Sequence, residues 1–182
     1  MYRTIFCERF PTEVFRVRTT SSSGNNCMLH ALISAYDPEY NTFNPSEQDE
    51  YIESIRELLC EKFTFEEYKN TSAYFFYLES KFSEFSYTSL LSDLRNNKFL
   101  GEGLIDFISD TLNVDIYFMR KVSKTHMDVY RYPSSDNIIH KGRFSVILLF
   151  DGSHYETVAV KRGSGFISLI PPDDILITNL KR

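Results

Sequence analysis

The stretch from Phe144 to Val160, FSVILLFDGSHYETVAV, constrains the fold of this chain more than any other part of the sequence. An apolar run, Phe144–Phe150, leads into a short turn, which is followed by a run that alternates apolar and polar residues. This pattern predicts two strands joined by the turn, with His154 at the start of the second strand. A sheet is therefore expected in the last third of the chain.

Helical patterns, in contrast, fill most of the first two thirds. Ser46 with Asp49 resembles a capping box, and Thr64 with Glu67 makes a second helix-start signal. Helices are expected over 27–36, after Ser46, after Thr64 and over 101–113. Strands are expected over 14–19, 114–119, 126–132, 143–150, 155–161 and 165–170. Turns such as 133–137 separate the later strands. The sequence therefore predicts one α+β domain over residues 1–182, a sheet flanked by helices.

Composition and charge argue against several classes of function. The net charge of −5, with no basic stripe, argues against a nucleic-acid partner and favours a basic protein or peptide. No apolar run is long enough to span a membrane, and the first ten residues lack the apolar core of a signal peptide. Three widely spaced cysteines, Cys7, Cys27 and Cys60, form neither a disulfide framework nor a zinc motif. We expect reduced thiols in a cytoplasmic protein, without metal or cofactor.

A run of small and turn-forming residues, 21–26, leads directly into Cys27 and a helical apolar pattern. A cysteine that opens a helix has its thiolate stabilised by the free N–H groups and the positive dipole end there. His154 can reach it only through tertiary structure, and an imidazole within hydrogen-bond reach would remove the thiol proton. The imidazole then needs an orienting acceptor, for which Asp151 and Glu156 are nearby. The alternative is that Cys27 is a core thiol and His154 a polar turn residue.

Three blocks of the sequence resemble the ovarian-tumour (OTU) family of deubiquitinases. GNNCMLHAL is similar to the family's nucleophile box, KFLGEGLIDFISDTLNVDIYFM to its Trp-Gly-Gly helix with the strand that follows, and DGSHYETVAV to its histidine segment. The blocks come in the family's order and cover most of the chain from about Val14 to Val160. The resemblance implies a papain-like fold with a central, mostly antiparallel sheet, and an isopeptidase that cuts after the C-terminal glycine of ubiquitin or a ubiquitin-like modifier.

The family's functional positions carry over to named residues. Cys27 takes the position of the nucleophile and His154 that of the general base, while Tyr155 takes the position that lines the channel for the glycine tail. Backbone N–H groups of the loop, around Asn25 and Cys27, would form the oxyanion hole. Glu156 stands where the family has the Asn or Asp that orients the histidine.

This chain departs from the family pattern at several of these positions. Gly24 and Asn25 replace the family's Asp and Gly, which main-chain oxyanion donors tolerate; with Asn26 they make up the loop. Glu156 is one methylene longer than the family's residue, so Asp151 or an acceptor elsewhere is the alternative. Phe99 or Leu100 takes the place of the tryptophan, and we expect that change to affect packing.

Other residues have simpler interpretations. His30 and Cys60 are expected to be structural, and His126 and His140 to be exposed to solvent. The acidic helix over 47–61 is expected to be a solvated face, with attraction of a basic partner as the alternative.

The resemblance also bears on partners. In the family, ubiquitin is held by regions that correspond to residues 70–98 and 118–132. We expect ubiquitin or polyubiquitin as the partner, no nucleic acid or membrane, and a monomer. The divergent motifs suggest a viral or bacterial member that acts in host cytoplasm. The alternatives are an inactive ubiquitin-binding module, a different cysteine hydrolase such as a broad peptidase or a transglutaminase-like enzyme, and a purely structural protein.

Overall fold

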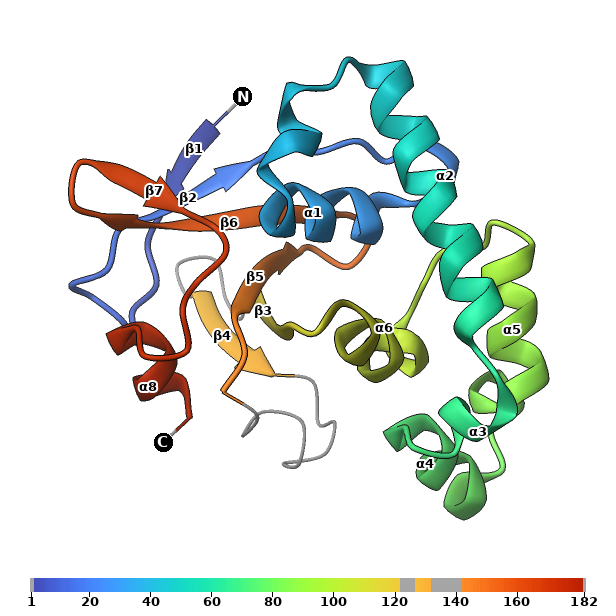
Figure 1. Cartoon of the computed structure of the whole chain (residues 1–182). Coiled ribbons are helices and arrows are strands. Elements are labelled where there is room, and N and C mark those ends of the chain that lie inside the picture. The colour runs from blue at the N-terminus through green and yellow to red at the C-terminus, as the bar shows by residue number, and fades with distance from the viewer. Residues whose placement is uncertain (1, 122–126, 132–141, 182) are drawn as a thin grey trace.

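The protein is described by a computed structural model that covers residues 2–121, 127–131 and 142–181. Within these residues, one sheet has the strand order β1-β2-β6-β5-β3-β4, and β7 pairs with β6 (Figure 1). The strands are β1 (Tyr2–Ile5), β2 (Phe15–Arg18), β3 (Asp115–Lys121), β4 (Met127–Arg131), β5 (Ser145–Phe150), β6 (Tyr155–Arg162) and β7 (Gly165–Ile167). Only the β3–β5 pair is parallel among the described pairings, so the sheet is mostly antiparallel, as the resemblance implied.

Helices cover both faces of this sheet. They are α1 (Cys27–Tyr36), α2 (Pro45–Lys62), α3 (Phe65–Tyr68), α4 (Ser72–Ser80), α5 (Tyr87–Arg95), α6 (Ile105–Leu112) and α8 (Ile175–Leu180), with short 3-10 turns η1 (Ser23–Asn25), η2 (Pro38–Thr42), η3 (Ser83–Phe85) and η4 (Glu102–Leu104). Helix α1 lies along β6, whereas α2 to α5 gather at one side of the molecule (Figure 1). The predicted α+β class is confirmed. No described helix is both long and apolar enough to cross a bilayer.

The two faces of the sheet close two separate hydrophobic cores. The alternation of side chains along β3 and β5 sends Phe118 and Leu148 toward α1 and the other helices, and Tyr117 and Ile147 toward α8. Burial on both faces explains why these strands read as nearly continuous apolar runs. Cys7 is fully buried in the α8 core, so it is a packing residue.

Several predicted elements have the expected bounds, but the start of one helix was placed wrongly. α1 covers 27–36 as predicted, and Thr64 caps α3 by accepting a hydrogen bond from the Glu67 N–H at 3.2 Å. The capping box of α2, however, is formed by Asn44 and Glu47 and not by Ser46 and Asp49. Pro45 explains the shift, because its fixed φ and missing N–H suit the first helical position.

Two further elements, β1 and α8, were not predicted from the sequence. The predicted turn over 133–137 lies outside the described residues, as does Tyr132 at the end of one expected strand.

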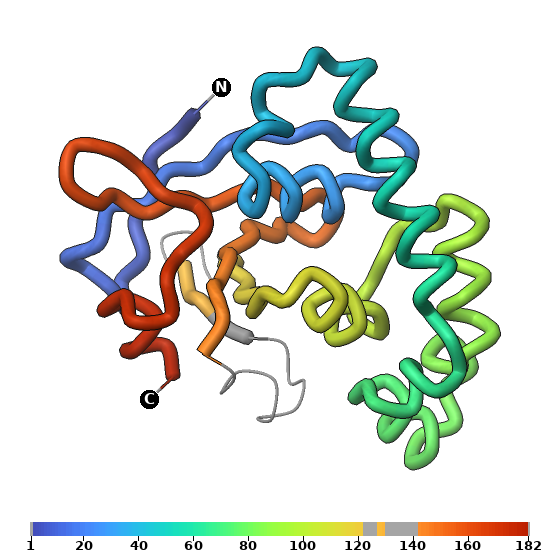
Figure 2. The backbone as a smooth tube through the Cα atoms, in the orientation of Figure 1, coloured from blue at the N-terminus to red at the C-terminus, as the bar shows by residue number. Residues whose placement is uncertain are grey.

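Figure 2 shows the consequence of the strand order for the chain ends: the blue N-terminal hairpin runs beside the orange strand β6. The segments before Cys27 and after His154 thus become neighbours.

Candidate active site

The loop before Cys27 turns through two left-handed residues. Gly24 (φ 63°) and Asn25 (φ 59°) lie in the region that glycine and asparagine tolerate best. Asn26 returns to negative φ, and its backbone N–H donates to the Ser23 carbonyl at 3.1 Å. Successive N–H groups in turns of this kind face one concavity that suits an anion. The loop is therefore a tight turn directly before Cys27, and the N–H of Asn26 is already engaged within it.

The side chain of Asn26 is locked into position by α2. Its Oδ1 accepts from Arg56 Nη1 at 2.5 Å, and its Nδ2 donates to Glu53 Oε1 at 3.1 Å. The rest of the Arg56 guanidinium donates to three backbone carbonyls, those of Asp93, Leu94 and Lys98, at 2.6 to 2.9 Å. Arg56 and Asn26 are each 2% exposed, so these bonds form away from water. The residue before Cys27 is thereby fixed to both α2 and the end of α5.

The thiol of Cys27 is buried at the start of α1 and lies against the start of β6. Burial raises the pKa of the Cys27 thiol, although the backbone N–H groups of Tyr155, Met28 and Cys27 itself lower it. We expected the helix terminus to stabilise the thiolate. The N–H groups act in that direction, but desolvation outweighs them. At neutral pH the thiol is therefore protonated and needs a base to become a nucleophile.

The turn that presents His154 is organised by Asp151. The Asp151 carboxylate accepts from the backbone N–H of Ser153 at 2.9 Å and of His154 at 2.8 Å, and these bonds lower its pKa. Gly152 at φ 101° allows the chain to turn back here. Since the Tyr155 amide acts on the Cys27 thiol, the residue next to it, His154, belongs to the same small region.

The carboxylate of Glu156 is held by the N-terminal part of the chain. Arg3 donates two hydrogen bonds to it, at 3.0 and 2.8 Å, and Thr19 donates a third at 2.9 Å. Burial alone would raise the pKa of Glu156, but these bonds, with the charges of Arg3 and His154, lower it below its ordinary value. Glu156 is thus an ionised carboxylate, electrostatically coupled to His154. Among the hydrogen bonds described for its side chain, none comes from the imidazole.

The ring of Tyr155 is buried in an aromatic stack. It lies 4.4 Å from the Phe150 ring and 5.8 Å from that of Phe99, with nearly parallel planes. Phe99 is 40% exposed, whereas Leu100 is buried, so Phe99 forms the outer layer of the stack. The exposed edge of this stack is thus aromatic, and Tyr155 lies beneath Phe99.

The remaining candidates have other environments. His30 is fully buried, and its Nδ1 pairs with the Tyr40 hydroxyl, as a structural role requires. Cys60 is half-buried beside the packed face of α2. His126 and His140 lie outside the described residues.

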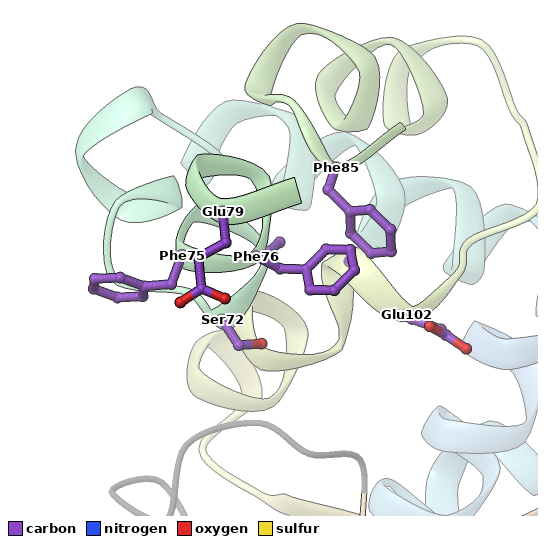
Figure 3. Close-up of a pocket in the computed structure, with 8 residues that line it drawn as sticks. Ser72, Phe75, Phe76, Glu79, Phe85 and Glu102 are labelled. Atoms are coloured by element: carbon purple, nitrogen blue, oxygen red, sulfur yellow. The ribbon is translucent and has the colours of Figure 1, made fainter. Parts of the chain in front are cut away.

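A groove of about 270 Å³ opens among α4, η3 and η4. Figure 3 shows the rings of Phe76 and Phe85 side by side, with Phe75 pointing outward and the carboxylates of Glu79 and Glu102 at the rim. Phe75 is 59% exposed and Phe76 43%, which is unusual for such large apolar side chains. The groove is therefore an apolar surface with acidic edges.

Two residues that contact the candidate catalytic segments, Arg3 and Arg56, were not predicted from the sequence. Arg3 lies in a four-residue strand without any motif, so nothing in the sequence marks it. Arg56 carried a signal, because it interrupts the apolar stripe of α2 between Ile52 and Leu59 and a charge at such a position must find buried partners.

Comparison with known proteins bears on the fold. No protein-family model matches the sequence, and no curated protein matches it. Among solved structures, an OTU domain in complex with ubiquitin is similar at 15% identity and a TM-score of 0.55, over 98% of this chain and 87% of that one. The viral OTU domain protease from Taggert virus is similar at 14% identity and a TM-score of 0.51, over 93% of this chain and 99% of that one. The chain therefore has the OTU fold.

Proposed function

We propose that this protein is a cysteine deubiquitinase that hydrolyses isopeptide bonds after the C-terminal glycine of ubiquitin or a ubiquitin-like modifier. The observation that carries the proposal is the position of the Cys27 thiol, at the start of α1 and against the Tyr155 amide beside His154. The OTU fold supports the same assignment, because a solved structure of that fold holds ubiquitin and another is a viral protease.

The first half of the reaction forms a thioester. His154 accepts the proton of the Cys27 thiol, and the thiolate attacks the glycyl carbonyl carbon, forming the C–S bond. The carbonyl oxygen becomes an oxyanion that the backbone N–H groups of Asn25 and Cys27 stabilise. His154 then gives its proton to the lysine nitrogen as the C–N bond breaks, which releases the amine.

The second half returns the enzyme to its starting state. Water attacks the thioester carbonyl while His154 takes one of its protons. The C–S bond then breaks, His154 returns that proton to the Cys27 sulfur, and the carboxyl group of ubiquitin is released. The raised pKa of Cys27 makes the base necessary, since the free thiol is protonated near neutral pH. Glu156 stabilises the imidazolium formed in both halves by its negative charge, and Arg3 and Thr19 keep its side chain in place.

The groove at α4 supports recognition of the folded body of ubiquitin. Most of its lining lies in the region 70–98, one of the two that the OTU resemblance associates with ubiquitin, and it exposes Phe75 and Phe76. The acidic rim of Glu79 and Glu102 suits a partner with basic residues around an apolar patch. A short peptide would not fill this surface, so we expect poor cleavage of short peptides.

The proposal is tested with ubiquitin that carries a C-terminal electrophile. We expect a one-to-one adduct with the wild type, none with Cys27→Ala, and slow formation with His154→Ala. Cys60→Ala is the matched control, because it removes a half-buried thiol elsewhere and leaves the adduct unchanged. Loss of the adduct in the Cys60 variant, or its survival in the Cys27 variant, would contradict the assignment.

An inactive ubiquitin-binding module is the second candidate. The observations that favour it are the raised pKa of Cys27 and the engagement of Glu156 by Arg3. For such a module, the wild type would retain ubiquitin in a pull-down and form no adduct. A different cysteine hydrolase would instead cleave short peptides and ignore the ubiquitin probe.

A further inference from the structure

A second candidate site lies where β1, β2, β6 and β7 meet. A cavity of about 280 Å³ opens here, and a neighbouring cavity of about 230 Å³ shares Tyr2 and Arg18 with it. The first contains Arg16 and Arg18, and the second is lined by hydroxyl and amide groups, among them Thr20 and Asn41. The two cavities adjoin at these two shared residues, and together they are called the groove.

Two arginines of this groove lack acidic partners. In a chain with net charge −5, neither Arg16 nor Arg18 pairs with a carboxylate among the ion pairs of the described residues. Each of Arg3, Arg9, Arg143 and Arg162, by contrast, does so. The groove thus keeps two positive charges that the excess of acidic residues leaves unneutralised.

Both guanidinium groups are nevertheless held in place. Arg16 lies between two aromatic rings, 4.0 Å from the Tyr2 centroid and 4.8 Å from that of Phe166. Nη1 of Arg18 donates to the backbone and hydroxyl oxygens of Ser34 and to Asn41. Groups fixed in advance lose little entropy when a ligand binds.

One N–H donor of Arg18 lacks an acceptor among the described residues. Nε of Arg18 is shielded from water and makes no hydrogen bond to any residue that the structure describes. A buried donor without a partner costs free energy, and an acceptor in the groove would recover it once the Arg18 side chain shifts to expose Nε. Arg16 and Arg18 also project from the same face of β2, about 7 Å apart along the strand. Carboxylates at alternate positions of an extended peptide have the same spacing.

We propose that this groove binds an extended acidic segment of a partner protein, with two carboxylates on Arg16 and Arg18. The assignment is independent of hydrolysis at Cys27. A carboxylate suits a fixed guanidinium because it accepts two parallel hydrogen bonds. The length of the groove favours a peptide over an isolated phosphate, since the hydroxyl and amide groups of the second cavity then contact the peptide backbone.

The test uses a fluorescent eight-residue peptide with Glu at alternate positions, and its Gln counterpart. Binding is measured by anisotropy to the full chain. We expect the Glu peptide to bind, the Gln peptide not to bind, and Arg16→Gln to weaken binding about tenfold. Arg16→Lys keeps the charge but loses the planar fork, so binding should also weaken. Arg95→Gln removes the same charge from an exposed part of α5 and should leave the affinity unchanged.

Three outcomes would overturn the proposal. They are no binding of the Glu peptide, an equal loss in Arg95→Gln, and binding of inorganic phosphate without binding of the peptide. Arg18→Gln serves as a second variant, and its thermal unfolding is measured alongside because Arg18 also supports Ser34 and Asn41.

Discussion

Nη1 of Arg56 lies 2.5 Å from Oδ1 of Asn26, so a buried cation of α2 determines the orientation of the side chain that precedes Cys27. The oxygen of the Asn26 amide must face the Arg56 guanidinium and its nitrogen the Glu53 carboxylate. Only one of the two orientations of this amide therefore satisfies both partners. The backbone of the candidate oxyanion loop is consequently held from outside the loop.

Replacing Asn26 by Ala should lower reactivity more than stability. We expect an adduct rate with the ubiquitin electrophile reduced about 100-fold, because a small displacement of reacting groups has effects of this size. The free energy of unfolding should fall by about 2 kcal/mol, the cost of a buried donor left unpaired at Arg56. Asn70→Ala, at an exposed position, is the control for both measurements. Unchanged adduct kinetics in Asn26→Ala would show that the loop does not need this anchor.

Arg3→Gln should make the protein less stable in a manner that depends on pH. A group whose pKa is lowered by folding, such as Glu156, adds stability above its unfolded pKa, and this stability disappears as the pH falls through the folded pKa. Arg3 is half exposed, so we expect a loss of only about 1 kcal/mol at pH 7. The difference between variant and wild type should shrink below about pH 4.3, the ordinary pKa of Glu.

Urea unfolding at a series of pH values measures this difference. Arg95→Gln, which changes the same charge without breaking the contact to Glu156, should show no such convergence. A gap between Arg3→Gln and wild type that stays constant at low pH would mean that the pair contributes nothing through ionisation.

The pH dependence of alkylation should reveal the base for Cys27. Burial raises the pKa of this thiol. Without a base beside it, Cys27 should therefore react slowly with iodoacetamide until the pH exceeds the ordinary pKa of a cysteine thiol. In the wild type, proton transfer to His154 should add reactivity near neutral pH, and His154→Ala should lose that part of the profile. Mass spectrometry in a Cys60→Ser background assigns the modified residue. Identical profiles in the two proteins would exclude His154 as the base.

Phe75→Asp should weaken substrate binding without affecting chemistry. The side chain is 59% exposed on the α4 groove, so its replacement leaves the cores intact. We expect KM for a ubiquitin conjugate to rise about tenfold with kcat unchanged, as for a residue at the centre of an interface. Ile175→Asp is the matched control, because Ile175 is 61% exposed on α8, across the sheet. An equal rise in both variants would indicate general loss of structure.

Local patterns were sufficient for elements that are buried along most of their length and bounded by turn residues. β3, β5 and α1 were predicted because each reads as an apolar run, and the structure buries most of their side chains. α8 was missed because ILITNL is rich in β-branched residues, which favour strands, and only the cap at Asp174 and packing against the second core make it helical.

The contacts that hold the residues of the candidate site could not be predicted from the sequence, for a different reason. Cys27, His154 and Glu156 were selected by residue type and order. The contacts of Glu156 with Arg3 and of Asn26 with Arg56, however, join residues whose proximity depends on strand order and helix packing. Neither arrangement leaves a local pattern, so long-range contacts of this kind are visible only in the folded chain.

Strand β1 contributes to both faces of the sheet, which links two distant sites energetically. It is an exposed edge strand of four residues, and among the described residues it pairs with β2 alone, so its opening requires far less free energy than global unfolding. When β1 detaches, Glu156 loses Arg3 and Arg16 loses the ring of Tyr2 in one event. A ligand that binds only where Tyr2 is in place therefore favours the closed strand, and by linkage it favours the paired state of Glu156.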